Sequence, residues 1–282
     1  MLDFNLFYTR TDSSNIENCI NMKKEKIGLI LIWLAGVATL LLFSISAEIP
    51  QDPEYHNFSD TSSFFLIPNT LNVISNVFFL IVGLIGFASL MFKPATTFNI
   101  ASSNFFAYVI LFLGAALIGV GSGYYHLSPT NETLVWDRLA MTLFFMALYS
   151  VIIGEFVSES KGRFLLFPLL LVGILSVLYW SYTESRGAGD LRYYAVVQFF
   201  PILTIPIILL FFKSKYSSVS GYWILFALYV VAKLFEHFDR DVHELLVVIS
   251  GHSLKHIVSA LGIYILFKSY SNKDRIKEVG DK

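Results

Sequence analysis

Three histidines carry the strongest chemical signal in the sequence. His252 and His256 are four residues apart near the start of the last long apolar segment, so they project from one face of a helix and can hold the same metal ion. His126 ends an earlier apolar segment, in the motif GSGYYH. Three imidazoles that leave a fourth position open to water are the usual ligand set of a catalytic zinc ion, whereas structural zinc sites close all four positions. The three histidines therefore predict a catalytic zinc site.

Two further residues could complete a hydrolytic site. Asp137 lies at the start of the apolar segment that follows His126. A carboxylate there can take a proton from water whose pKa zinc has lowered towards about 7, and can pass a proton to a leaving amine. Ser122 lies four residues before His126, on the same helical face, and can donate a hydrogen bond to the oxyanion that forms when water adds to a carbonyl group. The set predicts hydrolysis of an amide or an ester.

Helix packing is the simpler explanation for any one of these residues. Serine and histidine side chains form hydrogen bonds between membrane helices that contribute about 0.6–2 kcal/mol each. We would favour that explanation for a single histidine. Three histidines and an aspartate at matching membrane depth favour a functional site instead, because ionisable groups inside a membrane are costly and usually functional.

The elements that must position these residues are membrane-spanning helices. Of the 282 residues, 55% are hydrophobic and only 15% are charged, a more apolar composition than a water-soluble core needs. Apolar runs of about 20 residues can cross a hydrocarbon core of roughly 30 Å. Because backbone polar groups in lipid must be satisfied within each helix, the predicted fold is an all-α, polytopic transmembrane helical bundle. The predicted spans are 27–46, 69–92, 103–125, 134–157, 163–181, 193–213, 221–238 and 249–268.

The sequence before and after the main bundle is polar. Residues 1–26 are polar and irregular, and Met22 starts the motif MKKEK directly ahead of the first apolar run, so Met22 is a candidate start of translation. We favour an uncleaved anchor helix over 27–46, because this run exceeds the usual length of the apolar part of a signal peptide; cleavage after Ser46 or Ala47 is the alternative. An acidic loop over 47–68 and a tail over 269–282 complete the predicted organisation.

Charge distribution predicts the orientation and excludes some partners. Lysine and arginine gather on the side of the two termini, whereas the other side carries mostly acidic loops. The positive-inside rule therefore predicts cytoplasmic termini and a metal site towards the periplasmic or lumenal side. The net charge is −1 and no basic block is present, so a nucleic-acid partner is not expected. Cys19 is the only cysteine, which excludes a disulfide framework or a cysteine metal site within one chain.

Several motifs occur together with a specific spacing. IPN at 67–69 and NVISN at 72–76 precede Ser122, His126, Asp137 and the late histidine pair. In these residues the sequence resembles the alkaline ceramidase family, part of a larger superfamily of seven-helix membrane hydrolases that also includes adiponectin-type receptors and haemolysin-III-like proteins. The resemblance extends over most of the chain, from about residue 52 to residue 266.

The resemblance implies a fold and an activity. The fold is a seven-helix core over 69–268, so that 27–46 becomes one additional N-terminal helix. It also implies zinc on the three histidines, Asp137 as base and acid, and Ser122 in support. The expected reaction cleaves the amide bond of a ceramide-type membrane lipid to a sphingoid base and a fatty acid. The alternatives are a receptor or lipid-binding protein of the adiponectin-receptor type and, less favoured, an ion or proton transporter.

The resemblance also raises calcium binding. Some alkaline ceramidases bind calcium through acidic residues before the first core helix. An ordinary solvated acidic loop explains such residues as well, and we favour it, because the position where those enzymes place a glutamate is Asn69 here. The calcium candidates are Asp52, Glu54, Asn57 and Asp60.

Other polar residues have a structural explanation. Asn72 and Asn76 share one helical face and are expected to brace a neighbouring helix. Lys233 and Glu236 are spaced for an ion pair within one helix. Lys255 lies between the two late histidines, and because its ammonium would repel a metal ion, we expect it to point away from the metal or towards the membrane interface.

Overall fold

The computed structural model describes residues 5–93, 97–98, 100–217, 219–272, 274 and 276, and within them the chain is helical, as predicted. Helices longer than a few turns alternate with short connections. In chain order the elements are α1 (Asn5–Ile45), η1 (Pro53–His56), α2 (Thr70–Ile74), α3 (Val77–Phe92), η3 (Ser102–Asn104), α4 (Phe105–Leu127), α5 (Asn131–Phe156), α6 (Glu159–Ser185), α7 (Arg192–Phe211), α8 (Ser220–His237), α9 (Asp239–Leu246) and α10 (Gly251–Asn272).

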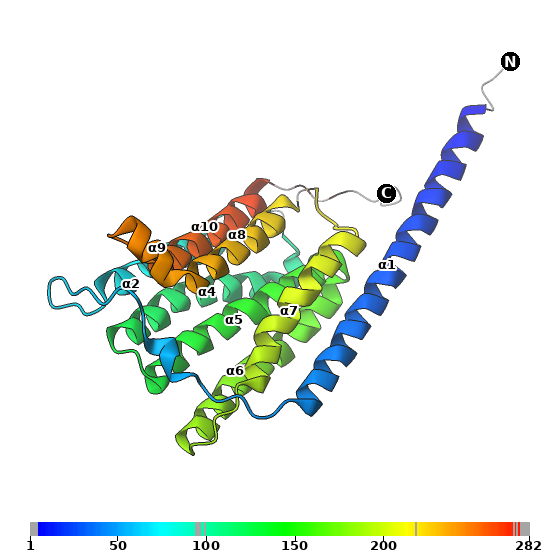
Figure 1. The fold of residues 1–282 in the computed structure, drawn as a ribbon. Helices are drawn as coiled ribbons and strands as arrows, with labels where there is room; N and C mark the ends of the chain where they lie inside the picture. Colours follow the sequence, from blue (N-terminus) through cyan, green and yellow to red (C-terminus); the bar gives the residue numbers. More distant parts are fainter. Residues whose placement is uncertain are drawn as a thin grey trace.

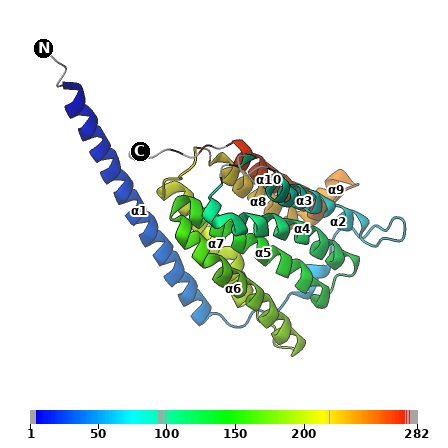
Figure 2. The same cartoon turned by 180° about the vertical axis from the view of Figure 1, so that it is seen from behind.

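The long helices form one bundle with α1 on its outside (Figure 1). The helices α4 and α5 pack against each other in the middle, with α3 against α4 and α6 against α5. On one side α7 packs on α5 and α6 and contacts α1; on the other side α10 packs on α8 and α3. The opposite view shows the same arrangement, with α1 running along the outside of the bundle beside α7 (Figure 2). This confirms the predicted core of seven helices with one additional N-terminal helix.

All eight predicted helices form, and apart from the start of α1 their ends lie within a few residues of the predicted ones, but two details of the prediction are wrong. The polar N-terminal segment is helical from Asn5 instead of irregular. The segment 69–92 is divided into α2 and α3 at Ser75. Of the tail predicted over 269–282, the first four residues extend α10, and most of the others lie outside the described residues.

By length and apolar composition alone, fewer helices qualify as membrane spans than the eight that were predicted. Within the described residues, six helical segments are long and apolar enough to cross a membrane, and α8 with α9 adds a seventh if this pair, bent by 80°, is one span. The helix α10 is outside this set because His252, Lys255 and His256 lie in its first two turns and lower its hydropathy. The residues that make α10 chemically interesting thus also weaken its apolar signal.

Candidate metal centre

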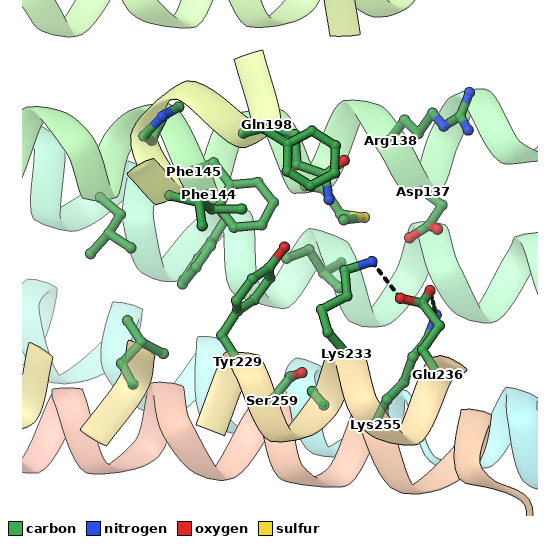
Figure 3. A pocket seen from close by; sticks show the side chains of 18 of the residues that line it. Asp137, Arg138, Phe144, Phe145, Gln198, Tyr229, Lys233, Glu236, Lys255 and Ser259 are labelled. Atoms are coloured by element: carbon green, nitrogen blue, oxygen red, sulfur yellow. Dashed lines mark hydrogen bonds and ion pairs between the residues drawn. The ribbon is translucent and has the colours of Figure 1, made fainter. Parts of the chain in front are cut away.

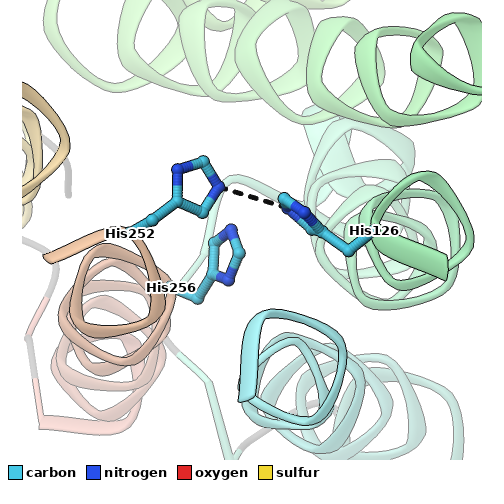
Figure 4. A group of neighbouring side chains, drawn as sticks. All are labelled: His126, His252 and His256. Carbon is cyan, nitrogen blue, oxygen red and sulfur yellow. Dashed lines mark hydrogen bonds between the residues drawn. The ribbon is translucent and has the colours of Figure 1, made fainter. Parts of the chain in front are cut away.

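The three histidines predicted to bind a metal come together in the structure (Figure 4). His126 lies in the last turn of α4, and His252 and His256 lie in the first two turns of α10. One ring nitrogen from each histidine lies within 4.8 Å of the others, and all three side chains are buried. The Nε2 atoms of His126 and His252 are 3.2 Å apart. Among the described residues, this is the one group of three or more histidine, cysteine or acidic side chains arranged to hold a metal ion.

A close approach of α4 and α5 brings Ser122 beside Asp137, the predicted acid–base residue. A Cβ atom on Gly121 would lie 2.5 Å from the carbonyl oxygen of Trp136, so only glycine allows this separation of the two helices. The helix α5 begins at a capping box in which the Thr130 hydroxyl accepts from the backbone N–H of Thr133. Asp137 therefore lies two turns into α5, buried next to the turn of α4 that carries Gly121 and Ser122.

The start of α10 is fixed by α8 and α9. Asp239, the first residue of α9, accepts a 2.7 Å hydrogen bond from the backbone N–H of His252 through Oδ1 and one of 2.9 Å from Ser59 through Oδ2. This carboxylate satisfies a free N–H of the first helical turn and ties the acidic loop to the metal centre. Gly251 permits the contact, since a Cβ there would lie 2.2 Å from the carbonyl oxygen of Phe235.

A second layer of polar groups orients His256. Its Nδ1 lies 2.8 Å from the Ser75 hydroxyl and 3.3 Å from the Asn76 amide, which leaves Nε2 to face the other histidines. Asn72 accepts a 2.7 Å hydrogen bond from Ser253 and so braces α2 against α10, as predicted. Asn76 does more than the predicted bracing, because it contacts a candidate ligand. Sequence reasoning missed Ser75, although it lies within the NVISN motif.

The environment of these rings fits a zinc ion. Nδ1 of His126 is buried and has no hydrogen-bond partner among the described residues. Buried ring nitrogens without partners are costly, and hydrogen bonding within the protein does not account for this one. Three buried imidazoles with one ring oriented by a hydrogen bond to its other nitrogen match a zinc centre with an oriented ligand. Phe58 covers the two neighbouring histidine rings: its ring centre lies 4.7 Å from that of His126 and 4.3 Å from that of His252.

The metal centre borders a cavity of about 500 Å³ inside the bundle. Ser122, Asp137 and His256 line one end of it, and the Ser122 side chain is the hydrogen-bond partner of the Asp137 carboxylate. The rest of the wall is mainly aromatic and aliphatic, including Phe144 and Phe145 (Figure 3). A long apolar group in this cavity could thus place a polar bond beside the histidines.

The acidic loop before α2 does not gather its carboxylates. The Asp52 side chain caps the short helix η1 by accepting from the backbone N–H of Glu54. Asn57 donates to Glu54, and Asp60 is turned towards the Ser62 backbone and hydroxyl. The calcium prediction therefore gains no support from the described residues.

The prediction for Lys255 is wrong in one respect. Its ammonium does not reach outward to the membrane interface but donates to Glu236 Oε1 at 2.6 Å, and it lines the cavity. The predicted pair of Lys233 and Glu236 is present, and it too lines the cavity. Helical spacing predicted the pair within α8, but not that a lysine of α10 would join it.

Comparison with known proteins agrees with this geometry. No curated protein matches the chain. Residues 62–278 match the profile of a family described as Ceramidase, a range that covers all seven core helices from α2 and α3 through α10 together with the three histidines, Ser122 and Asp137. The chain therefore belongs to the ceramidase family of membrane amidohydrolases.

Proposed function

We propose that the protein is a zinc-dependent hydrolase that cleaves the amide bond of ceramide-type N-acyl lipids, with water as co-substrate and a sphingoid base and a fatty acid as products. The observation that carries this proposal is a group of three buried histidines, one of which, His256, lines a mainly apolar cavity. An N-acyl lipid is largely apolar with one amide bond near its polar end, which matches the shape and lining of this cavity.

His126, His252 and His256 would hold the metal through one ring nitrogen each. When bound there, zinc supplies Lewis acidity, which activates water and polarises the amide carbonyl. Ser75 orients the His256 ring by accepting from its Nδ1–H, so that Nε2 faces the centre. These residues account for the binding and orientation part of the mechanism.

Asp137 moves the protons in this proposal. Its carboxylate takes a proton from the attacking water and delivers one to the nitrogen of the scissile amide. The C–N bond then breaks, its electron pair stays on nitrogen, and a neutral amine leaves. Ser122 holds the carboxylate in place and can donate to the oxygen that gains negative charge as water adds. Since one amide bond breaks and one C–O bond forms, water supplies all the atoms that the two products gain.

Access and orientation follow from the membrane. A substrate this apolar enters sideways from the bilayer, in which it is dissolved. The positive-inside rule gives cytoplasmic termini and a metal centre towards the periplasmic or lumenal side. The histidines lie at the end of the bundle opposite to the start of α1 and the end of α10, in accord with that proposal (Figure 1).

The test is metal analysis of the purified protein combined with an assay for fatty acid released from ceramide. We expect about one zinc ion per chain, and release that stops when a chelator removes the metal and returns when zinc is added. A preparation that contains zinc but releases no fatty acid from any N-acyl lipid, while a ceramidase of known activity does so in the same micelles, would refute the proposal.

A further inference from the structure

Charged side chains gather around Asp137 at one end of the cavity, whereas Phe144 and Phe145 mark the apolar part (Figure 3). Apart from Asp137, these charged residues have no role in metal binding or in the proposed proton transfer. Ionisable groups inside a membrane protein are costly and rare unless they have a function. The charged residues of the cavity wall are Asp137, Arg138, Lys233, Glu236 and Lys255.

One carboxylate in this group serves two ammonium groups. Glu236 accepts from Lys233 on its own helix and from Lys255 on α10. Lys233 extends from α8 into the cavity, in the direction of α5, and Glu236 lies opposite Asp137 (Figure 3). Asp137 is the second carboxylate of the group and interacts electrostatically with Lys255. The two lysines and two carboxylates therefore compensate one another.

Arg138 interacts electrostatically with Asp137 as well, but it forms no ion pair among the described residues. Its side chain is buried, and Nη2 donates to Gln51 Oε1 at 2.5 Å, while Nη1 has no partner among the described residues. Aromatic faces surround the guanidinium carbon, with ring centres at 4.1 Å for Trp180, 4.8 Å for Tyr194 and 5.7 Å for Tyr55. Such faces attract a cation and fix its position, but they do not neutralise it.

Three cationic and two acidic side chains leave this end of the cavity with one positive charge in excess. A buried charge without a counter-charge is costly, and an anion in the cavity would remove that cost. We propose that this end of the cavity binds the anionic headgroup of a lipid, with Arg138 and Lys233 as its cationic contacts. If the proposed hydrolysis is correct, the preferred substrate is an N-acyl lipid whose amine-bearing half carries a phosphate, sulfonate or carboxylate group.

The order of groups along the cavity agrees with such a lipid. The amide bond would lie beside Ser122, Asp137 and His256, the anion next to it against Arg138 and Lys233 at the same end, and the acyl chain in the apolar part. A neutral headgroup with only hydroxyl groups would leave the excess charge uncompensated. A fatty acid carboxylate is a second source of an anion, so the test must separate a charged headgroup from the released product.

Binding of matched lipids to the purified full-length protein tests the subsite without depending on turnover. The ligands are an N-acyl sphingoid base with a free primary hydroxyl, the same lipid phosphorylated at that hydroxyl, and the corresponding free fatty acid. We expect the phosphorylated lipid to bind at least tenfold more tightly than the neutral lipid, since charge-assisted hydrogen bonds are strong in a cavity of low dielectric.

Substitutions locate the effect. Lys233→Gln should lower this preference by about tenfold, and Arg138→Gln should lower it further, because Nη1 of Arg138 is buried without a hydrogen-bond partner among the described residues, whereas Lys233 already donates to Glu236. Arg138→Lys, which keeps the charge, should retain part of the preference if the fold is intact. Lys161→Gln removes an exposed lysine of α6 outside this cavity and should leave the preference unchanged.

Three results would overturn the proposal. The first is equal affinity of the wild-type protein for the neutral and the phosphorylated lipid. The second is an equal loss for both lipids in Lys233→Gln. The third is a fatty acid that binds more tightly than the phosphorylated lipid, which would assign the cations to the product.

Hydrolysis of the same lipids then separates the two proposals. Cleavage of the neutral lipid without a preference for the anion leaves only the proposed function standing, whereas preferential binding without cleavage of any lipid leaves only the subsite standing.

Discussion

Two buried polar clusters lie at opposite ends of the bundle, and only one of them has the geometry of a reaction centre. The histidine cluster lies where α4 ends and α10 begins. The other cluster surrounds Glu155, near the end of α5, with Tyr108, Tyr222 and Tyr270 from α4, α8 and α10. Both place ionisable groups inside a membrane protein, so burial alone would assign a function to each.

The two clusters differ in what their polar atoms face. Tyr108 donates to Glu155 Oε1 at 2.5 Å, and the Tyr222 and Tyr270 hydroxyls are 3.2 Å apart, so this cluster directs its groups at one another. Glu155 is fully buried and does not line the cavity, although Tyr222 of the same cluster does. The histidines instead point ring nitrogens at a common position beside the cavity. Ring nitrogens that face one common position, more than burial, distinguish a candidate reaction centre from a structural network.

Removal of a histidine ligand is expected to have the largest effect. His256→Ala takes away one of three protein ligands, so zinc and hydrolysis should be lost together. Zinc content per folded chain and fatty acid release measure the two losses, and circular dichroism checks that the helices remain. His237→Ala is the matched control. His237 is exposed at the end of α8, so this variant should keep its zinc. Full zinc content in His256→Ala would exclude His256 as a ligand.

Removal of the acid–base group should separate catalysis from metal binding. Asp137→Asn should retain zinc while the rate falls by about 10²–10⁴, the usual contribution of general acid–base catalysis. Ser122→Ala should cost less, because an oxyanion donor contributes about 10²–10³ elsewhere and the metal already polarises the carbonyl. Single-turnover hydrolysis with zinc analysis measures both. Full activity in Asp137→Asn contradicts its role, and loss of zinc there would make Asp137 a ligand or a support for one.

The histidine cluster could be predicted from the sequence because each of its parts has a local signature. Two histidines at helical spacing share a face, and the ends of apolar segments give the membrane depth of His126 and Asp137. The seven core helices could be predicted for the same reason, since apolar length alone indicates a span. The family match covers this same region.

The contacts around the cluster could not be predicted, because they join segments that are distant in sequence. No local signal predicts that Asp239 of α9 accepts from the first turn of α10, or that Phe58 packs against the histidine rings. Spacing placed Lys255 on a helical face but did not identify Glu236 as the neighbour that faces it. The Glu155 cluster was missed altogether, because its four members come from four different helices.

Neutralising the second cluster tests whether it is structural. Glu155→Gln retains an acceptor for Tyr108 but removes the charge-assisted part of that hydrogen bond, so the protein should lose about 1–3 kcal/mol of stability. Thermal unfolding in detergent measures this loss. Zinc content and hydrolysis per folded chain should stay at the wild-type level, because Glu155 does not line the cavity. A variant with the thermal stability of the wild type that no longer hydrolyses lipid would show that the second cluster contributes to the reaction.

A third carboxylate, Asp190, lies just before the membrane-spanning helix α7 and pairs with Arg192, the first residue of that helix, where the smallest effect is expected. Its oxygens accept from Nε and Nη2 of Arg192 at 2.9 Å each, and this hydrogen bonding lowers the pKa of Asp190 below its ordinary value. A lowered carboxyl pKa stabilises the folded state above the unfolded pKa of about 4, and this contribution is lost as the pH falls through the folded pKa. Asp190→Asn should therefore lower stability by about 1 kcal/mol or less near pH 7, with the difference shrinking below about pH 4. Unfolding of both proteins at matched pH isolates the pair, because any loss of metal in acid affects them equally. A difference that grows as the pH falls would mean that Asp190 stabilises the fold in its protonated form.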